Sequence, residues 1–215
     1  MFNFAPLFEI AMDKREQILE VAETLFAEHG YEGTSVRKLA LKARINIAMI
    51  SYYFGSKEKL FEALVEYRAG GAHEKLQSLN QKEYDPVTKI EKLVDLYVDK
   101  IFDNHRFHKI LQREIALQQR SKMHELIMTI LMRNMNEIRK IIEEGQRKKK
   151  FRKVDIECTI ATMIGTISQV TKSSLLACKM INLNPETNSI FDEKNKTRVK
   201  KHLRELLINH LVIKK

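Results

Sequence analysis

The sequence predicts an all-α protein in two parts, a small N-terminal three-helix domain that contains a helix-turn-helix and a larger helical domain. The first observation is composition: 44% of the 215 residues are hydrophobic and 31% are charged, with 7 Gly and 3 Pro, which is typical of a soluble, helix-rich globule. The second is that apolar residues recur three and four positions apart, as on buried helix faces. The third is a formal net charge of +10, which indicates polyanionic partners. We expect the domains to span residues 11–71 and 72–215, with the helix-turn-helix at about 34–54.

The first helix is expected to begin at Asp13, whose carboxylate would cap the free N–H groups of the first turn, and to end at Gly30. Its apolar stripe consists of Ile18, Val21, Ala22, Leu25 and Phe26. This stripe predicts that the helix packs across the two helices that follow and holds them rigid.

Residues 34–60 are predicted to form two short helices joined by a tight turn, followed by the start of a third helix. Thr34 and Asn46 stand where N-cap side chains accept hydrogen bonds from the first turn, in the case of Asn46 from the N–H of Met49. Ser56 caps the third helix in the same way. This is the helix-turn-helix layout, whose second helix enters the major groove of DNA.

Each of the two short helices has an apolar side and a free side. The apolar residues are Val36, Leu39, Ala40 and Ala43 in the first helix, and Ile45, Ile50 and Phe54 around the second. A separate face of the second helix carries Ile47, Ala48, Ser51 and Tyr52. The two sides predict that the second helix is anchored in the domain by one face and leaves the other for DNA.

The charges of this stretch agree with a DNA-binding role. Residues 34–60 contain six basic side chains and one acid, Glu58, and phosphate contacts need such a local excess. Lys57 stands in the first turn of the third helix, where free N–H groups already favour an anion. Tyr52 and Tyr53 can hydrogen-bond phosphate oxygens. The alternative is a small helical bundle with a solvated basic face.

The segment INIAMISYYFGSKEKLF resembles the signature of the TetR family of transcriptional regulators. The matching residues are Asn46, Ala48, Ile50, Tyr53, Phe54, Ser56, Lys57, Glu58 and Leu60, preceded by Phe26, Gly30, Tyr31, Thr34, Val36, Leu39 and Ala40. Two positions depart from the family: Ser51 stands where Tyr is frequent, and Arg44 where the turn usually has Gly. The operator sequence therefore cannot be transferred to this chain.

The resemblance implies which residues contact DNA. The expected set is Thr34, Ser35, Arg37, Arg44, Asn46, Ile47, Ala48, Met49, Ser51, Tyr52, Tyr53 and Lys57. Within this set, Ala48, Met49, Ser51 and Tyr52 are expected to approach base edges, and Thr34, Tyr53 and Lys57 to hold phosphates. In the family the third helix also links the DNA-binding domain to the ligand-binding domain. Gly70 and Gly71, which together cost about 2 kcal/mol inside a helix, mark either its end or a hinge.

The larger domain is expected to hold a pocket for an apolar or amphipathic small molecule. Asp85 and Pro86 open its first helix, and a later helix ends at Gly145. Met128, Met132 and Met135 widen the apolar face of that later helix, and methionine adapts to ligands of varied shape; ordinary core packing is the alternative. The candidate pocket residues are Tyr97, Ile101, Met128, Met132, Met135 and Met163.

Two further helices are predicted, one from the cap Asp155 to about Met180 and one from about Lys196 to Ile213. The resemblance implies that these helices pair with their copies in a twofold four-helix interface. The expected interface residues are Ile160, Ile164, Ile167, Leu203, Leu207 and Leu211. Amphipathicity by itself indicates only that the two helices pack against something.

Other classes of function find little support. The sequence contains no GxSxG, HExxH, CxxC or glycine-rich phosphate loop, so an enzyme is not expected and no cofactor is assigned. His105, His108 and His124 lack metal-ligand partners at a suitable spacing, so no metal is expected. No membrane span or signal peptide is indicated, and Cys158 and Cys178 are expected to stay reduced, which favours a cytoplasmic protein.

The sequence thus predicts a ligand-responsive repressor that binds an inverted-repeat DNA operator as a homodimer and is released by a small effector. Two alternatives stay open. One is an activator of the same family. The other is a small-molecule carrier whose helix-turn-helix is vestigial.

Overall fold

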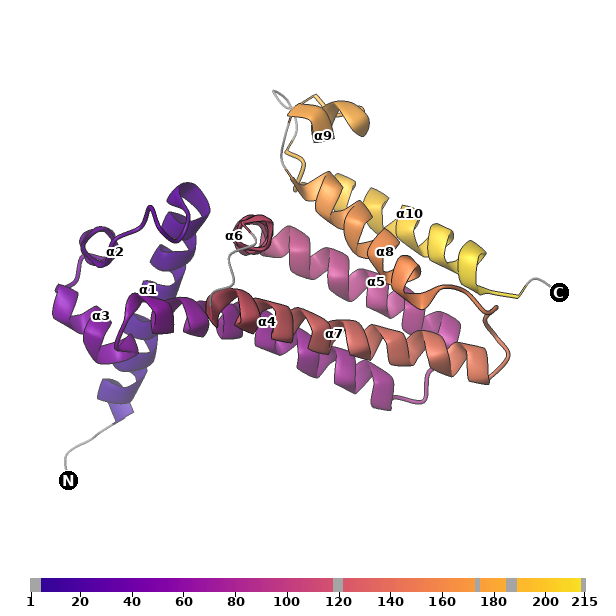
Figure 1. The fold of residues 1–215 in the computed structure, drawn as a ribbon, viewed down its shortest axis with the longest axis horizontal. Helices are drawn as coiled ribbons and strands as arrows, with labels where there is room; N and C mark the ends of the chain where they lie inside the picture. Colours follow the sequence, from indigo (N-terminus) through magenta and orange to yellow (C-terminus); the bar gives the residue numbers. More distant parts are fainter. Residues whose placement is uncertain (1–4, 118–121, 173–174, 185–188, 214–215) are drawn as a thin grey trace. The chain divides into compact units, whose positions relative to one another are not determined.

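The computed structural model describes residues 5–117, 122–172, 175–184 and 189–213, and within these ranges it contains ten α-helices and no strand (Figure 1). The helices are α1 (Ala5–His29), α2 (Val36–Ala43), α3 (Ile47–Phe54), α4 (Lys57–Gln81), α5 (Pro86–Asp103), α6 (His105–Ala116), α7 (Lys122–Arg147), α8 (Ile156–Thr171), α9 (Leu175–Met180) and α10 (Glu193–Leu211). The predicted all-α class is confirmed.

The chain divides into two compact units. The first unit comprises Met1–Gly70 and Arg106–Met128, and the second comprises Gly71–His105 and Thr129–Lys215. The helix-turn-helix lies in the first unit together with nearly all of α6. The domain limits inferred from the sequence stay predictions.

The core of the first unit is formed where α1 crosses α2 and the start of α4. Phe26 of α1 and Phe61 of α4 meet edge to face with ring centroids 5.4 Å apart, and Tyr31 packs on Phe61 at the same separation. Such aromatic pairs add to the burial of apolar area. The expected start of α1 at Asp13 is wrong, because the helix begins at Ala5. Pro6 lies in its first turn, where the missing N–H costs nothing.

The cap of α2 is Ser35 and not Thr34 as expected. The Ser35 side chain accepts from the N–H of Lys38, whereas the hydroxyl of Thr34 donates to the carbonyls of Leu25 and Gly30 at 3.1 and 2.8 Å. Thr34 is 0% exposed, so it ties the end of α1 to the start of α2. At the other end of α2, Arg44 adopts the left-handed conformation with φ 54°.

The helix α4 continues through Gly70 and Gly71, so the two glycines do not end it. A Cβ atom at either glycine would meet nothing within 4 Å. Close packing therefore does not require glycine at these positions. Whether they act as a hinge stays a prediction.

In the second unit, α5 is packed between two layers of helices. On one side lie α8 and α10, and on the other lie α7 and the C-terminal part of α4 (Figure 1). The core side chains come from all five helices and include Leu76, Val94, Ile138, Ile167 and Leu203. Asp85 caps α5 by accepting from the N–H of Val87, and Pro86 occupies the first turn, as predicted.

Two predicted helix ends in the second unit are wrong. The helix α7 passes Gly145 and ends at Arg147. The glycine does not end the helix but leaves space for a side chain, since a Cβ at Gly145 would lie 2.0 Å from the ring of Phe151. The helix capped by Asp155 stops at Thr171, and Leu175–Met180 is a separate helix, α9. Cys158 on α8 and Cys178 on α9 are both free.

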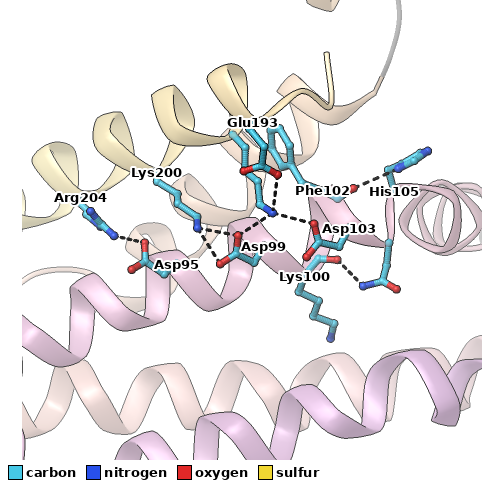
Figure 2. A network of polar contacts seen from close by, with 11 residues as sticks. Asp95, Asp99, Lys100, Phe102, Asp103, His105, Glu193, Lys200 and Arg204 are labelled. Carbon is cyan, nitrogen blue, oxygen red and sulfur yellow. Dashed lines mark hydrogen bonds and ion pairs between the residues drawn. The ribbon is translucent and has the colours of Figure 1, made fainter. Parts of the chain in front are cut away.

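A row of ion pairs joins α5 to α10 (Figure 2). Asp95, Asp99 and Asp103 stand four residues apart and so share one face of α5. Arg204, Lys200 and Lys196 meet them in reverse order, which makes the two helices antiparallel. Lys200 Nζ lies 2.7 Å from a carboxylate oxygen of Asp99, and Lys196 Nζ lies 2.8 Å from one of Asp103.

Candidate nucleic-acid interface

One face of α3 is free, and the opposite face is fixed in the core. Ile50 and Phe54 are buried, whereas Ile47, Ala48, Ser51 and Tyr52 are exposed, Tyr52 to 83%. The side chain of Asn46 caps the helix by accepting from the N–H of Ala48 at 2.9 Å, so the predicted cap is confirmed and its predicted donor, Met49, is wrong. The first turn of α3 is thereby fixed while its outer face stays open.

Basic side chains border this face. Arg37 on α2 and Arg44 in the turn are exposed, as are Ser35 and Asn46 at the two caps. The structure adds Lys38 and Lys42, which are also exposed on α2 and were absent from the expected set. The sequence feature that could have identified both lysines is their position on the polar side of α2, away from its apolar stripe. Met49 and Tyr53 are half-buried beside the exposed face of α3.

Thr34 and Lys57 have structural roles that the sequence did not indicate. The hydroxyl of Thr34 is buried and engaged within the chain, so it cannot reach a phosphate. The ammonium group of Lys57 donates to the carbonyls of Tyr31 and Thr34 at 3.0 and 3.2 Å. It also lies 3.9 Å from the centroid of the Tyr31 ring, a cation–π distance. Lys57 therefore fastens the start of α4 to the turn between α1 and α2.

The six expected pocket residues do not form one group. Tyr97, Ile101 and Met163 are buried in the core of the second unit. Met135 packs against that core from a half-buried position. Met132 is 46% exposed, and Met128 is 37% exposed and belongs to the first unit. The broad apolar face of α7 thus turns partly outward, so the methionine row does not line a single interior site.

The expected interface residues are occupied within the chain itself. Ile160, Ile167, Leu203, Leu207 and Leu211 are buried in the core of the second unit, and Ile164 is half-buried against it. The expectation that Ile160, Ile167, Leu203, Leu207 and Leu211 face a second copy is therefore wrong, because α8 and α10 turn these side chains towards α5. For the half-buried Ile164 it stays a prediction. The faces of α8 and α10 that remain exposed carry Cys158, Ala161, Thr162, Gly165 and Leu206.

The histidines considered as metal ligands have partners in the fold. The ring of His105 stacks on that of Phe191 with centroids 4.0 Å apart, and Nε2 of His108 lies 3.0 Å from the side-chain nitrogen of Gln112. Within the described ranges, no group of three or more His, Cys, Asp or Glu residues is arranged to hold a metal ion. No helix in the described part of the chain is long and apolar enough to cross a membrane.

Comparisons with known proteins agree with this geometry. Residues 18–64 match the family described as "Bacterial regulatory proteins, tetR family". The Bacillus subtilis protein YttP, a probable HTH-type transcriptional regulator, is 31% identical over 140 residues, which cover 64% of this chain and 67% of YttP.

Two solved structures share the fold. The transcriptional regulator FadR from Bacillus subtilis, in complex with stearoyl-CoA, superposes with a TM-score of 0.64 at 19% identity, over 87% of this chain and 96% of that one. AibR, in complex with isovaleryl coenzyme A and operator DNA, gives a TM-score of 0.69 at 17% identity, over 90% and 97% of the two chains. The relatives are transcriptional regulators and not enzymes. The motif match, the identity with YttP and the free face of α3 lead to one conclusion: the chain belongs to the TetR family of transcriptional regulators.

Proposed function

We propose that this regulator is a repressor that binds an inverted-repeat operator with α3 in the major groove. The observation that carries the proposal is the division of α3 into a buried side and an exposed side. Ala48, Ser51 and Tyr52 would reach base edges, with Ile47 and Met49 beside them. Short side chains such as Ala48 allow the helix to approach the bases closely, and Ser51 and Tyr52 supply hydrogen-bonding groups.

Phosphate contacts would come from both ends of α2, from the turn and from Tyr53 on α3. The proposed residues are Ser35, Arg37, Lys38, Lys42, Arg44, Asn46 and Tyr53. Four of these are cations, and each cation that neutralises a phosphate releases counterions and steepens the dependence of affinity on salt. Thr34 and Lys57 would act indirectly, since their hydrogen bonds tie the starts of α2 and α4 to the turn after α1.

A homodimer is the natural partner of an inverted repeat, since two recognition helices must lie about 34–36 Å apart, or a multiple of that distance. We propose that the dimer forms through the exposed faces of α8 and α10. Ala161 and Gly165 would let a second helix approach closely, and Leu206 supplies an exposed apolar side chain on α10. Leu175 and Leu176 on α9 are exposed as well.

The proposed effector is an apolar or amphipathic small molecule bound in the second unit. FadR with stearoyl-CoA and AibR with isovaleryl coenzyme A suggest acyl compounds as the first to test. An effector shifts the equilibrium only by its difference in affinity for the two states, so a tenfold loss of DNA binding needs about 1.4 kcal/mol. Operator DNA must then weaken effector binding by the same factor, which calorimetry with and without operator measures.

The test is fluorescence anisotropy with DNA from upstream of the protein's own gene. We expect salt-dependent binding that is specific for one segment, and an altered preference among operator variants for Tyr52→Ala and Ser51→Ala. Tyr67→Ala is the matched control, because Tyr67 is an exposed tyrosine of α4 outside the proposed interface. Equal weak binding to all DNA would support the carrier alternative. Lower reporter expression after deletion of the gene would support an activator.

A further inference from the structure

Lys100 is unlike the acidic residues that neighbour it on α5. Asp99 and Asp103 face α10 and are paired with its lysines, whereas the side chain of Lys100 points away from α10, towards the layer of α4 and α7 (Figure 2). Its ammonium group makes no hydrogen bond or ion pair with any residue that the structure describes. Burial, and secondly the charge of Lys75 on α4, lower the pKa of Lys100 to about 8.

The register of the helices places Lys100 opposite two other polar residues. Lys89 Nζ on α5 lies 2.7 Å from a carboxylate oxygen of Glu144 on α7 and 2.9 Å from the carbonyl oxygen of Asn80 on α4. From this point α5 runs opposite to both neighbours (Figure 1). The eleven residues from Lys89 to Lys100 span about 16 Å. The same distance from Glu144 towards the N-terminus of α7 reaches the level of Asn134. On α4, the same step from Asn80 ends within about one helical turn of His73.

Asn134 is an unsatisfied polar group in an otherwise apolar stripe. It interrupts the row Ile127, Ile130, Ile138 and Ile141 of α7 and is 3% exposed. Its Oδ1 atom has no hydrogen-bond partner, and neither has the buried Nδ1 atom of His73. Buried polar atoms in folded proteins nearly always have a partner. Asn134 on α7 and His73 on α4, both within about one helical turn of the level of Lys100 on α5, therefore each carry a buried atom without a hydrogen-bond partner.

We infer that these residues form the head-group site of the effector and that the effector is a carboxylate attached to an apolar chain. The inference rests on the proposed function and specifies its ligand. Lys100 would pair with the carboxylate, Asn134 and His73 would hydrogen-bond it, and the chain would lie along Tyr97 and Ile101, which are buried on the same helix. A cationic head group would be repelled by Lys100, and a neutral one would leave the half-buried lysine without an ion-pair partner.

The other charges around Lys100 favour an anion. On α4, Lys75 adds positive charge. On α7, Glu137 is engaged by Asn80 and Lys140, and Arg133 is exposed. Met163 and Ile167 of α8 are apolar. Asp99 and Asp103, on Lys100's own helix, are paired on the α10 side.

The experiment is calorimetric titration of the full chain with straight-chain carboxylates from hexanoate to tetradecanoate. The matching alcohols and acyl-CoA thioesters are titrated in parallel. We expect at least one carboxylate to bind about tenfold or more tightly than its alcohol. Lys100→Met should abolish this preference and Lys100→Arg should keep it. Lys92→Met is the control, because Lys92 is an exposed lysine of the same helix.

A second readout is the proton taken up on binding. At pH 9 a lysine whose pKa is about 8 is mostly neutral, and pairing with a carboxylate raises its pKa and recharges it. Titrations in two buffers of different ionisation enthalpy should therefore give close to one proton taken up by the unmodified chain and none by Lys100→Met or Lys100→Arg.

Three outcomes would overturn the inference: no carboxylate binds up to millimolar concentration, alcohols bind as tightly as carboxylates, or CoA thioesters bind tightly without dependence on Lys100. Operator binding by Lys100→Met without any probe is measured separately and should equal that of the unmodified chain. If DNA binding is present and the titrations fail, only the head-group assignment is wrong. If specific DNA binding is absent from the unmodified chain, the proposed function fails.

Discussion

The guanidinium group of Arg113 on α6 lies directly against Gly30, the residue that follows α1. A Cβ at Gly30 would lie 2.7 Å from Cζ of Arg113, and Gly30 has φ 75°. The next residue, Tyr31, donates its N–H to the carboxylate of Glu114. Arg113 and Glu114, two consecutive residues of α6, thus contact the turn that leads into the helix-turn-helix.

Gly30→Ala should destabilise the first unit by about 1–3 kcal/mol, because alanine is strained at positive φ and its Cβ would displace Arg113. Gly70→Ala is the matched control with the opposite sign. Gly70 lies inside α4 with open space around it, so alanine should stabilise by up to about 1 kcal/mol. Urea unfolding measures both. A Gly30→Ala variant as stable as the parent would show that neither the backbone conformation nor the fit against Arg113 matters.

Lys57→Ala should act on stability more than on electrostatics. The variant loses two hydrogen bonds to carbonyl groups and a cation–π contact, which we expect to cost about 1–2 kcal/mol. Lys42→Ala removes an exposed charge beside the proposed interface, and should reduce the salt slope of DNA binding by about one unit with little change in stability. Anisotropy from low to high salt, with thermal unfolding of each variant, separates the two effects. If Lys57→Ala instead reduced the salt slope of DNA binding by about one unit and left stability unchanged, Lys57 would be a phosphate contact.

The ion pairs of Asp99 make the stability of the second unit depend on pH. Burial by itself would raise the pKa of Asp99, but hydrogen bonds from Lys200 and Lys196 outweigh burial and hold the pKa below its ordinary value of 3.8. The contribution to stability is therefore complete above this ordinary value and is lost as pH falls through the lower pKa of the folded state. Asp99→Asn should cost about 0.5–1 kcal/mol at pH 7 and less at pH 3. Glu205→Gln, at an exposed acid of α10, is the control for urea midpoints at both pH values.

Gly165→Arg should break the proposed dimer and leave the chain folded. A Cβ atom at Gly165 would meet no atom within 4 Å in the single chain, but an arginine there would obstruct a second copy packed on α8. Ile167→Glu, in contrast, places a charge at a fully buried position and should unfold the second unit. Sedimentation with circular dichroism distinguishes the two results. If the Gly165→Arg variant remained a dimer, the dimer interface would not lie on this face of α8.

Local chemistry made some elements predictable from the sequence. The caps Asn46, Ser56, Asp85 and Asp155 each accept a backbone N–H at the start of a helix, because short polar side chains do this with little dependence on the rest of the fold. The choice between adjacent Thr34 and Ser35 was not local. The hydroxyl of Thr34 donates to the carbonyls of Leu25 in α1 and of Gly30 just after it, and only the packing of α1 reveals that.

Non-local contacts explain the other differences. The stripe Ile160, Ile167, Leu203 and Leu207 is apolar in sequence whether it meets α5 or a second copy, so periodicity could not separate the two. Gly145 resembles a helix end until the Phe151 ring is seen in the space it leaves. Lys57 in a first turn suggests an anion site, and the carbonyls that it meets come from residues more than twenty positions earlier. The polar group of Lys100, Asn134 and His73 required the register of three helices.

Arg44 has a consequence for the stability of the turn. It holds a left-handed backbone conformation that glycine adopts without strain, at a cost of about 1 kcal/mol for a residue with a Cβ atom. A change to glycine would therefore make the turn more stable while removing a cation from the border of α3. At this position the backbone strain and the local positive charge are therefore coupled, and neither can be changed by this substitution without the other.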